Sequence, residues 1–322
     1  MRHYRDSGGT ARGVRDSSSS FMFIFTLTLA VFAAFGNATA SVLQRKAARR
    51  EPDARTFSIR LMWDLVRQPV WVGGIAAVTT GFILQAIALG LGSLSVVQPM
   101  LVLELPFTLM LASLVFRARL HAREWTAAVG MSAGLAIFLI ALRPSGGDPR
   151  HVTLVTWVLG LGFSLTIAGI FVWIGARHRH AARAAYLSIA TGIGFGATAA
   201  LVNGVAAAFA GGINGVFTAW QTYAVIVLGP ASTFMLQNTL QSGRLVAAQP
   251  GLTLVNPIVA VIWGVTIFSE EIRVGPWLAG TFGGAALIVA CTILLSRSPL
   301  LHGQGGSSEQ NASRNRDPDG HV

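Results

Sequence analysis

The chain has 322 residues, of which 52% are hydrophobic and only 11% are charged, and its formal net charge at pH 7 is +11. Because a soluble domain carries about 25% charged residues, this composition excludes an ordinary soluble domain. Apolar stretches of about twenty residues, the length of a helix that crosses the hydrocarbon core, recur from residue 21 to residue 295. Barrel strands would instead alternate apolar and polar residues over about ten positions, a pattern that the sequence lacks. We therefore predict an all-α polytopic protein of the inner or plasma membrane.

The positive charge is carried almost entirely by arginine, since Lys46 is the only lysine. The arginines fall between the apolar stretches, where basic residues set topology and face anionic lipid. We interpret them in that way and predict no nucleic-acid partner. The single cysteine, Cys291, excludes an intramolecular disulfide and a thiolate metal cluster. The sequence has no His-Glu-x-x-His, Walker loop or nucleophile elbow, so we predict no enzyme activity, no cofactor and no metal site.

Nine spanning helices are predicted along the chain. They lie at residues 21–43, 70–91, 95–116, 125–142, 152–175, 185–210, 217–240, 244–268 and 276–295. The segment 56–66 is apolar on one side and carries Arg60 and Asp64 on the other, which is typical of an interfacial helix; a tenth span there is the alternative. Residues 1–20 and 296–322 are polar, and we expect them to be disordered tails.

The orientation of the chain follows from its basic residues, which favour cytoplasmic segments. With the N-terminus outside, 17 Arg and Lys residues fall in cytoplasmic segments and 7 in external ones. This distribution predicts an external N-terminus and a cytoplasmic C-terminus.

The two halves of the sequence resemble each other. Residues 98–106 read QPMLVLELP and residues 249–257 read QPGLTLVNP, with Gln, Pro, two Leu and a second Pro at identical spacing. Leu-Gln, Gly-x-x-x-Gly and Phe-Gly motifs recur in the same order in each half. We predict a first membrane repeat at 21–142, a linking fifth span within 143–184, and a second repeat at 185–295. Because one helix separates two four-helix units, the second unit is inverted, as in alternating-access transporters.

These motifs are similar to those of the drug/metabolite transporter superfamily, in its EamA-like branch. The resemblance covers residues 70–142 and 185–295 and rests on the two Gln-Pro motifs, the later prolines, the acidic turns at Arg123-Glu124 and Glu270-Glu271, and the Gly-rich spans that follow. It implies secondary transport, with export favoured over import. Typical members have ten helices, whereas nine are predicted here. The nine-helix count also resembles the NIPA-like magnesium transporters, but GFILQAIALG in the second span lacks the carboxylate of that subfamily.

Glu104 is the strongest candidate for a functional residue, because it lies near the centre of the third span. A charged residue at that depth costs at least about 2.5–3.5 kcal/mol on insertion scales. We expect Glu104 to couple transport to protons or to bind a cation. The alternative is a structural glutamate that is protonated or bonded to a neighbouring helix.

Further candidates are amides and prolines in the spans. Amides can bond a polar solute or join helices; those assigned to the site are Gln98, Gln249, Asn256, Gln85, Gln237 and Asn37. Prolines free backbone carbonyls, and such irregular backbone is tolerated where it lines a cavity or is packed in protein. The helix breaks expected to line the site are at Pro106, Pro257, Pro99 and Pro250.

The remaining motifs have structural interpretations. Small residues at a spacing of four let helices approach closely, so Gly130, Gly134, Gly280 and Gly284 are expected to pack helices within one protomer or between the protomers of a homodimer. The acidic residues of the turns, Glu124, Glu270 and Glu271, are expected to be solvated.

The sequence therefore predicts a secondary transporter that moves a small organic solute by alternating access, with a proton as the coupling ion and the lipid bilayer as its environment. The first alternative is a divalent-cation permease for Mg²⁺, for which one mid-span carboxylate with amides is a thin ligand set. The second alternative, of a different class, is a non-transporting membrane scaffold or lipid-handling protein.

Overall fold

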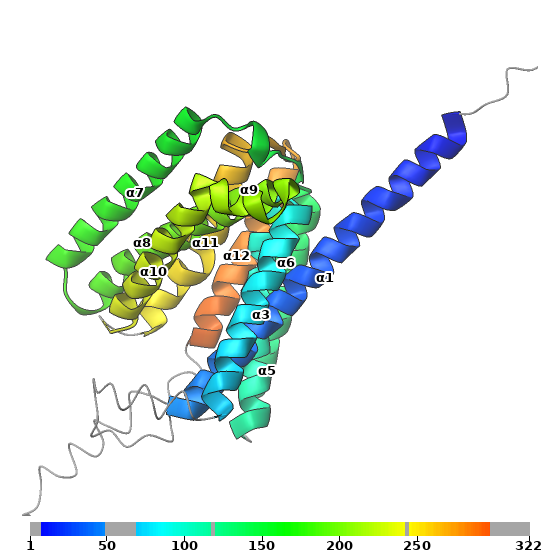
Figure 1. The fold of residues 1–322 in the computed structure, drawn as a ribbon. Coiled ribbons are helices and arrows are strands. Elements are labelled where there is room, and N and C mark those ends of the chain that lie inside the picture. Colours follow the sequence, from blue (N-terminus) through cyan, green and yellow to red (C-terminus); the bar gives the residue numbers. More distant parts are fainter. Residues whose placement is uncertain (1–7, 49–68, 117–119, 242–244, 297–322) are drawn as a thin grey trace, which may run out of the picture.

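The computed structural model describes residues 8–48, 69–116, 120–241 and 245–296, which are almost entirely α-helical (Figure 1). Its elements are, in chain order, α1 (Gly8–Ala48), α3 (Pro69–Leu91), α4 (Leu94–Met100), η1 (Leu101–Leu103), α5 (Glu104–Phe116), α6 (Ala122–Leu142), β1 (Ser145–Gly146), η2 (Pro149–His151), α7 (Leu154–Arg177), α8 (His180–Ala208), η3 (Phe209–Gly211), α9 (Gly212–Thr218), α10 (Trp220–Gln241), α11 (Leu245–Thr266), β2 (Glu270–Glu271) and α12 (Trp277–Ser296).

Seven segments of the described chain are long and apolar enough to span a membrane. They are Phe21–Gln44, Val72–Leu91, Leu94–Phe116, Ala122–Leu142, Leu154–Arg177, Ala182–Thr218 and Trp277–Ser296, and a shorter apolar helix covers Gly251–Thr266. The prediction of an all-α, multi-pass membrane protein is therefore confirmed. Helix α10 lies where a span was predicted at 217–240 but falls outside these seven, because its glutamines, threonines and Asn238 make it more polar.

The N-terminal helix differs from the prediction of a disordered segment at residues 1–20, because α1 begins at Gly8 and continues without interruption into the first span. Once the apolar span has formed a helix, each added residue gains one hydrogen bond without a new nucleation cost. The predicted interfacial helix at 56–66 and nearly all of the C-terminal tail at 296–322 lie outside the described residues.

Helix α8 lies at the centre of the second half. It packs against α7, α10 and α11, while α1 packs along α3 and α5 in the first half. Figure 1 shows α7 at the edge of the molecule beside α8 and α10. The described core between these helices contains an aromatic cluster in which Trp157 of α7, only 1% exposed, contacts Trp220, Trp263 and Phe268.

Helices α6 and α12 approach closely through the predicted glycine motifs. A Cβ atom built on Gly284 would lie 2.6 Å from the carbonyl oxygen of Gly134, a separation that real Cβ atoms do not show. A Cβ on Gly130 would collide with the sulfur of Cys291, and one on Gly280 would lie 3.0 Å from the Cβ of Ala141. In these contacts, higher residue numbers on α6 pair with lower residue numbers on α12, so the two helices are antiparallel. The small residues allow their backbones to touch.

The loops at one end of α6 and α12 are joined by a short antiparallel pair of strands. β1 and β2 pair Ser145 with Glu271 and Gly146 with Glu270. On either side of this pair, the Asp148 N–H donates to the Phe268 carbonyl at 3.0 Å and the Arg273 N–H to the Leu142 carbonyl at 2.9 Å. This pairing fixes Glu270 beside the start of α4.

The α6–α12 contact can be tested with neighbouring glycines. Gly284→Ala should destabilise the protein by about 1–3 kcal/mol, because the added methyl group meets backbone atoms that cannot move away without separating the helices. Gly283→Ala is the matched control, since a Cβ atom there meets no atom within 4 Å. The measurement is the thermal unfolding midpoint of each purified variant in detergent. Equal midpoints for the two variants would show that the close contact does not exist.

Candidate functional site

The third span contains a 3-10 turn near its middle, directly before Glu104. Helix α4 ends at Met100, a 3-10 turn follows at Leu101–Leu103, and Glu104 is the first residue of α5. Pro106 occupies the first turn of α5, where its missing N–H would have no intrahelical acceptor in any case. The predicted break at Pro106 is thus a switch to 3-10 geometry just before it.

Glu104 meets two polar side chains of α1. The Ser41 hydroxyl donates to Glu104 Oε1 at 3.5 Å, and the Asn37 side chain also hydrogen-bonds this carboxyl group. Asn37 and Ser41 are four residues apart and so lie on one face of the helix. Sequence analysis named Glu104 and Asn37 separately, and the structure brings them together between α1 and α5; it did not single out Ser41.

The third helix of this region supplies space for the polar cluster. A Cβ built on Gly81 of α3 would lie 2.6 Å from Asn37 Oδ1 and 3.1 Å from the Ala33 carbonyl oxygen. Gly36 faces the same helix, since its Cβ would lie 3.1 Å from the Gly81 Cα. Glycine is therefore needed at 81 for α3 to close over Asn37, and the three residues Asn37, Ser41 and Glu104 form what we call the carboxyl cluster.

Two of the predicted amides are enclosed. Gln98 is 1% exposed, and its amide nitrogen and oxygen have no hydrogen-bond partner within the described part of the chain. The side-chain oxygen of Asn256 is likewise buried without a partner there. Because a buried polar group without a partner is costly, these amides are suited to bond a solute or water. Neither has a recorded hydrogen bond to the carboxyl cluster.

The remaining predicted site residues are dispersed. Gln85 is half-buried on α3, and Gln237 is exposed on α10. The side chains of Gln249 and Pro250 lie outside the described residues, although the backbone there belongs to α11.

Three of the expected helix breaks are absent. Pro99 lies inside α4, and α11 is continuous through positions 250 and 257. Around Pro257 the helix packs tightly on α8, where Cβ atoms on Gly192 and Gly196 would lie 2.6 Å and 2.7 Å from Val255 and Val259. Backbone freed by proline is tolerated where it is packed in protein, and this packing keeps α11 helical.

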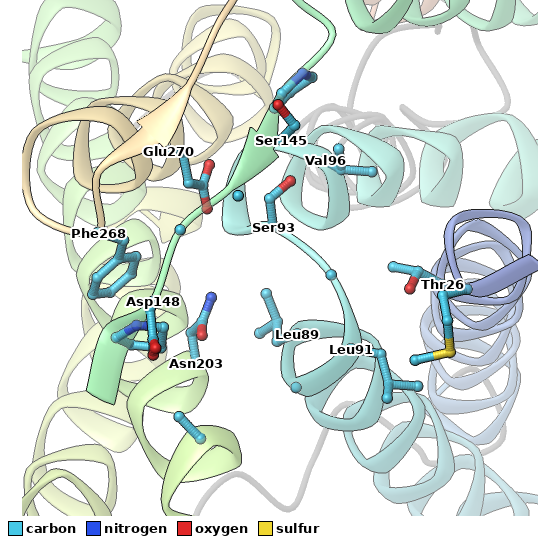
Figure 2. Close-up of a pocket in the computed structure, with 18 of the residues that line it drawn as sticks. Thr26, Leu89, Leu91, Ser93, Val96, Ser145, Asp148, Asn203, Phe268 and Glu270 are labelled. Carbon is cyan, nitrogen blue, oxygen red and sulfur yellow. The ribbon is translucent and has the colours of Figure 1, made fainter. Parts of the chain in front are cut away.

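A second polar site lies where α3 and α4 meet the loops. It is a cavity of about 510 Å³ lined by the α3–α4 turn, the loop after α6, α1 and α8. Figure 2 shows Asp148, Asn203 and Glu270 on one side of this cavity and Thr26 of α1 on the opposite side.

Glu270 joins this cavity to the start of α4. Its Oε1 accepts the Leu94 N–H at 2.7 Å and its Oε2 accepts the Ser95 N–H at 3.1 Å. These are two of the N–H groups that have no acceptor within the helix itself. Burial raises the pKa of Glu270, and the hydrogen bonds from Ser95 and Leu94 partly oppose that rise.

The acidic turns are therefore less solvated than predicted. Glu270 is 4% exposed and Glu124 only 2%, whereas Glu271 is exposed as expected. The Glu124 carboxylate accepts the His121 N–H at 2.8 Å at the start of α6. Both buried carboxylates thus act at helix N-termini, where negative charge is favourable.

The loop after α6 carries the other acidic side chain of the cavity. Asp148 accepts the Arg150 N–H at 2.9 Å and contacts His151 Nδ1 at 2.8 Å. The backbone hydrogen bond from Arg150 is the main reason that the pKa of Asp148 lies below its usual value. Within the described ranges, no three His, Cys, Asp or Glu side chains lie close enough together to hold a metal ion.

The role of Glu270 can be tested against its neighbour. Glu270→Ala leaves the Leu94 and Ser95 N–H groups without an acceptor and should cost about 1–3 kcal/mol of stability for each buried group left unpaired. Glu271→Ala, one residue further and exposed, should change stability by less than about 0.5 kcal/mol. Thermal unfolding in detergent measures both. If the two variants unfold at the same temperature, the cap on α4 contributes no stability.

Comparison with known proteins finds a relative that matches over nearly its full length. An uncharacterized protein of Corynebacterium glutamicum is 30% identical over 287 residues, which cover 88% of this chain and 97% of the relative. No family model matches the chain, and no solved structure matches it. The alignment includes nearly the whole of both chains, and the chain therefore belongs to the family of this Corynebacterium glutamicum protein.

Proposed function

We propose that the chain is a secondary transporter that moves a small organic solute across the cytoplasmic membrane and exchanges it for protons at Glu104. The observation that carries the proposal is the carboxyl cluster. Glu104 is the only carboxylate in the interior of the seven apolar spans; Glu124, the other one in these spans, lies in the first turn of its helix. A carboxylate that is kept at membrane depth, against its insertion cost, marks an ion or substrate pathway in membrane proteins.

The geometry of the cluster supports a proton step. Ser41 and Asn37 belong to α1, whereas Glu104 begins α5 directly after the 3-10 turn. An ionised Glu104 accepts hydrogen bonds from both side chains, and a protonated Glu104 becomes a donor. A movement of α1 relative to α5 would therefore be linked to gain or loss of one proton. Substrate would bind to the ionised form, and protonation would release it.

Contacts between α6 and α12 support inverted repeats. Exchanging each residue for its counterpart 150 positions away converts the Gly130–Cys291 contact into Gly280–Ala141, and both contacts occur. The same exchange leaves the Gly134–Gly284 contact unchanged. This is the pattern of a local two-fold axis through an antiparallel helix pair. It agrees with the resemblance to the drug/metabolite transporter superfamily. It also agrees with a nine-span arrangement that counts α10 and α11 as spans and in which α7 separates two inverted units.

The coupling step is tested with Glu104→Gln, which keeps the shape of the side chain and removes its titration. Wild-type protein in proteoliposomes, on solid-supported membranes, should give solute-dependent currents that vary with pH. Amino acids, nucleosides, cationic drugs and Mg²⁺ form the panel. The variant should lose about a hundredfold or more of the pH-dependent transport, the scale expected when a positioned proton-transfer group is removed.

Glu271→Gln is the matched control, because Glu271 is exposed and lies outside the cluster. Normal transport by Glu104→Gln with an unchanged pH profile would refute proton coupling at this residue. A current with Mg²⁺ alone would favour the cation permease. Radiolabelled solute uptake covers electroneutral exchange, and silence in both assays would favour the scaffold or lipid-handling function.

The proposed orientation, with the N-terminus outside, is tested by cysteine labelling. In a Cys291→Ala background, Ser145→Cys should react with a membrane-impermeant maleimide in intact cells, because the loop after α6 is external in this orientation. His121→Cys, at the other end of α6, should react only after the cells are opened. Both positions are exposed. The reverse labelling pattern would place the N-terminus in the cytoplasm.

A further inference from the structure

A large groove opens between helices of the first half of the chain. It has a volume of about 1300 Å³ and lies between α1, α4, α5 and α6. Its walls are apolar and include Leu27 of α1, Met100 of α4, Phe107 of α5 and Leu139 of α6. The groove exists because α1 packs along α3 and α5, whereas α6 packs along α12. The walls therefore diverge, and the side chains between them leave space.

The groove is open toward the region that hydrocarbon occupies. Met110, Val129 and Ile140 line it and are each more than one-third exposed. In a soluble protein an apolar opening of this size would mark a protein interface, but these residues belong to membrane-spanning helices. The surrounding solvent at this depth is lipid.

One end of the groove is positively charged. Arg143 and Arg273 both line it, together with Ser145. The bond from the Arg273 N–H to the Leu142 carbonyl, at 2.9 Å, brings the two arginines to the same level. Arg143 is exposed at the end of α6, and the Arg273 guanidinium lies 4.4 Å from the centre of the Trp277 ring. Among the described carboxylates, none forms an ion pair with either arginine.

The charged end lies at the depth of lipid headgroups. From Trp125, which lines the opposite end, to Arg143 the helix rises about 27 Å at 1.5 Å per residue, close to the roughly 30 Å of hydrocarbon in a bilayer. Trp125 is half-exposed, as is usual for tryptophan at a membrane interface. The groove thus runs between the two interfaces and carries its cations at only one of them.

We propose that this groove binds an anionic phospholipid, with one acyl chain between α1 and α6 and the phosphate at Arg143 and Arg273. Guanidinium groups match phosphate geometry and can contact two of its oxygens. Two cations without a recorded carboxylate partner favour a lipid with net negative charge over a zwitterionic one of equal chain length. This ligand is distinct from the transported solute, because the groove faces the bilayer and does not include the carboxyl cluster.

The test is native mass spectrometry of the full-length protein in detergent. It is titrated with phosphatidylglycerol and, separately, with phosphatidylcholine of the same acyl chains. Wild type should bind phosphatidylglycerol more tightly. In the double variant Arg143→Gln/Arg273→Gln, the ratio of the two dissociation constants should fall by at least about fivefold. This is the effect expected from one basic residue near a charged membrane surface. Arg143→Lys/Arg273→Lys, which keeps both charges, should retain most of the preference. Unchanged phosphatidylcholine binding by the glutamine variant shows that this variant has not simply unfolded.

Two matched controls separate the groove from the rest of the surface. Arg150→Gln removes an arginine of the same loop that does not line the groove, and it should leave the preference unchanged. Ala136→Phe places a ring inside the groove and should weaken binding of both lipids, whereas Ala279→Phe on the exposed side of α12 should not. A preference that survives loss of both arginines, or binding that is indifferent to Ala136→Phe, would overturn the proposal.

Discussion

The first N–H groups of a helix have no acceptor within that helix, so where the start of the helix is buried their acceptors must come from elsewhere in the protein. The start of α4 depends on this constraint, because Leu94 and Ser95 are buried. Glu270, which is 176 residues from Leu94 in sequence, supplies two acceptors at the first turn of α4. The β1–β2 pair holds Glu270 in place, and α4 in turn leads to the 3-10 turn that directly precedes Glu104. The last loop of the second half thereby fixes the start of the helix that carries the candidate coupling residue of the first half.

The two halves also meet at glycines, which have no side chains to keep the helices apart. Between α6 and α12 the closest contacts are made by glycines, so that backbone meets backbone along the crossing. In a membrane such contacts replace the hydrophobic driving force that joins helices in water, because lipid is as apolar as the helices themselves. Glu270 at one end and the glycine crossing along the spans together hold one half of the chain against the other.

The sequence was informative where the local pattern alone determined the role of a residue. Apolar length predicted seven spans that the structure shows as long apolar helices in the described part of the chain, out of nine expected. A lone mid-span carboxylate directed attention to Glu104, which does meet Asn37. It was uninformative where meaning depended on distant partners. Glu270 was expected to be solvated because acidic residues in turns usually are, and nothing near it in sequence indicates that its acceptors serve α4. Pro257 was expected to break its helix, but packing of Val255 and Val259 on the glycines of α8 preserves α11. Local patterns contain neither kind of tertiary contact.

The aromatic cluster around Trp157 has a consequence for the order of assembly. Helix α7 is synthesised before α8, α10 and α11, yet the partners of Trp157 come from α10, α11 and the loop that follows. The Ser164 hydroxyl of α7 likewise accepts the indole N–H of Trp263, at 3.1 Å. Because membrane helices insert first and associate afterwards, α7 enters the bilayer early but cannot dock until its later partners arrive. Burial of Trp157 therefore marks the arrival of α10, α11 and the loop that follows them.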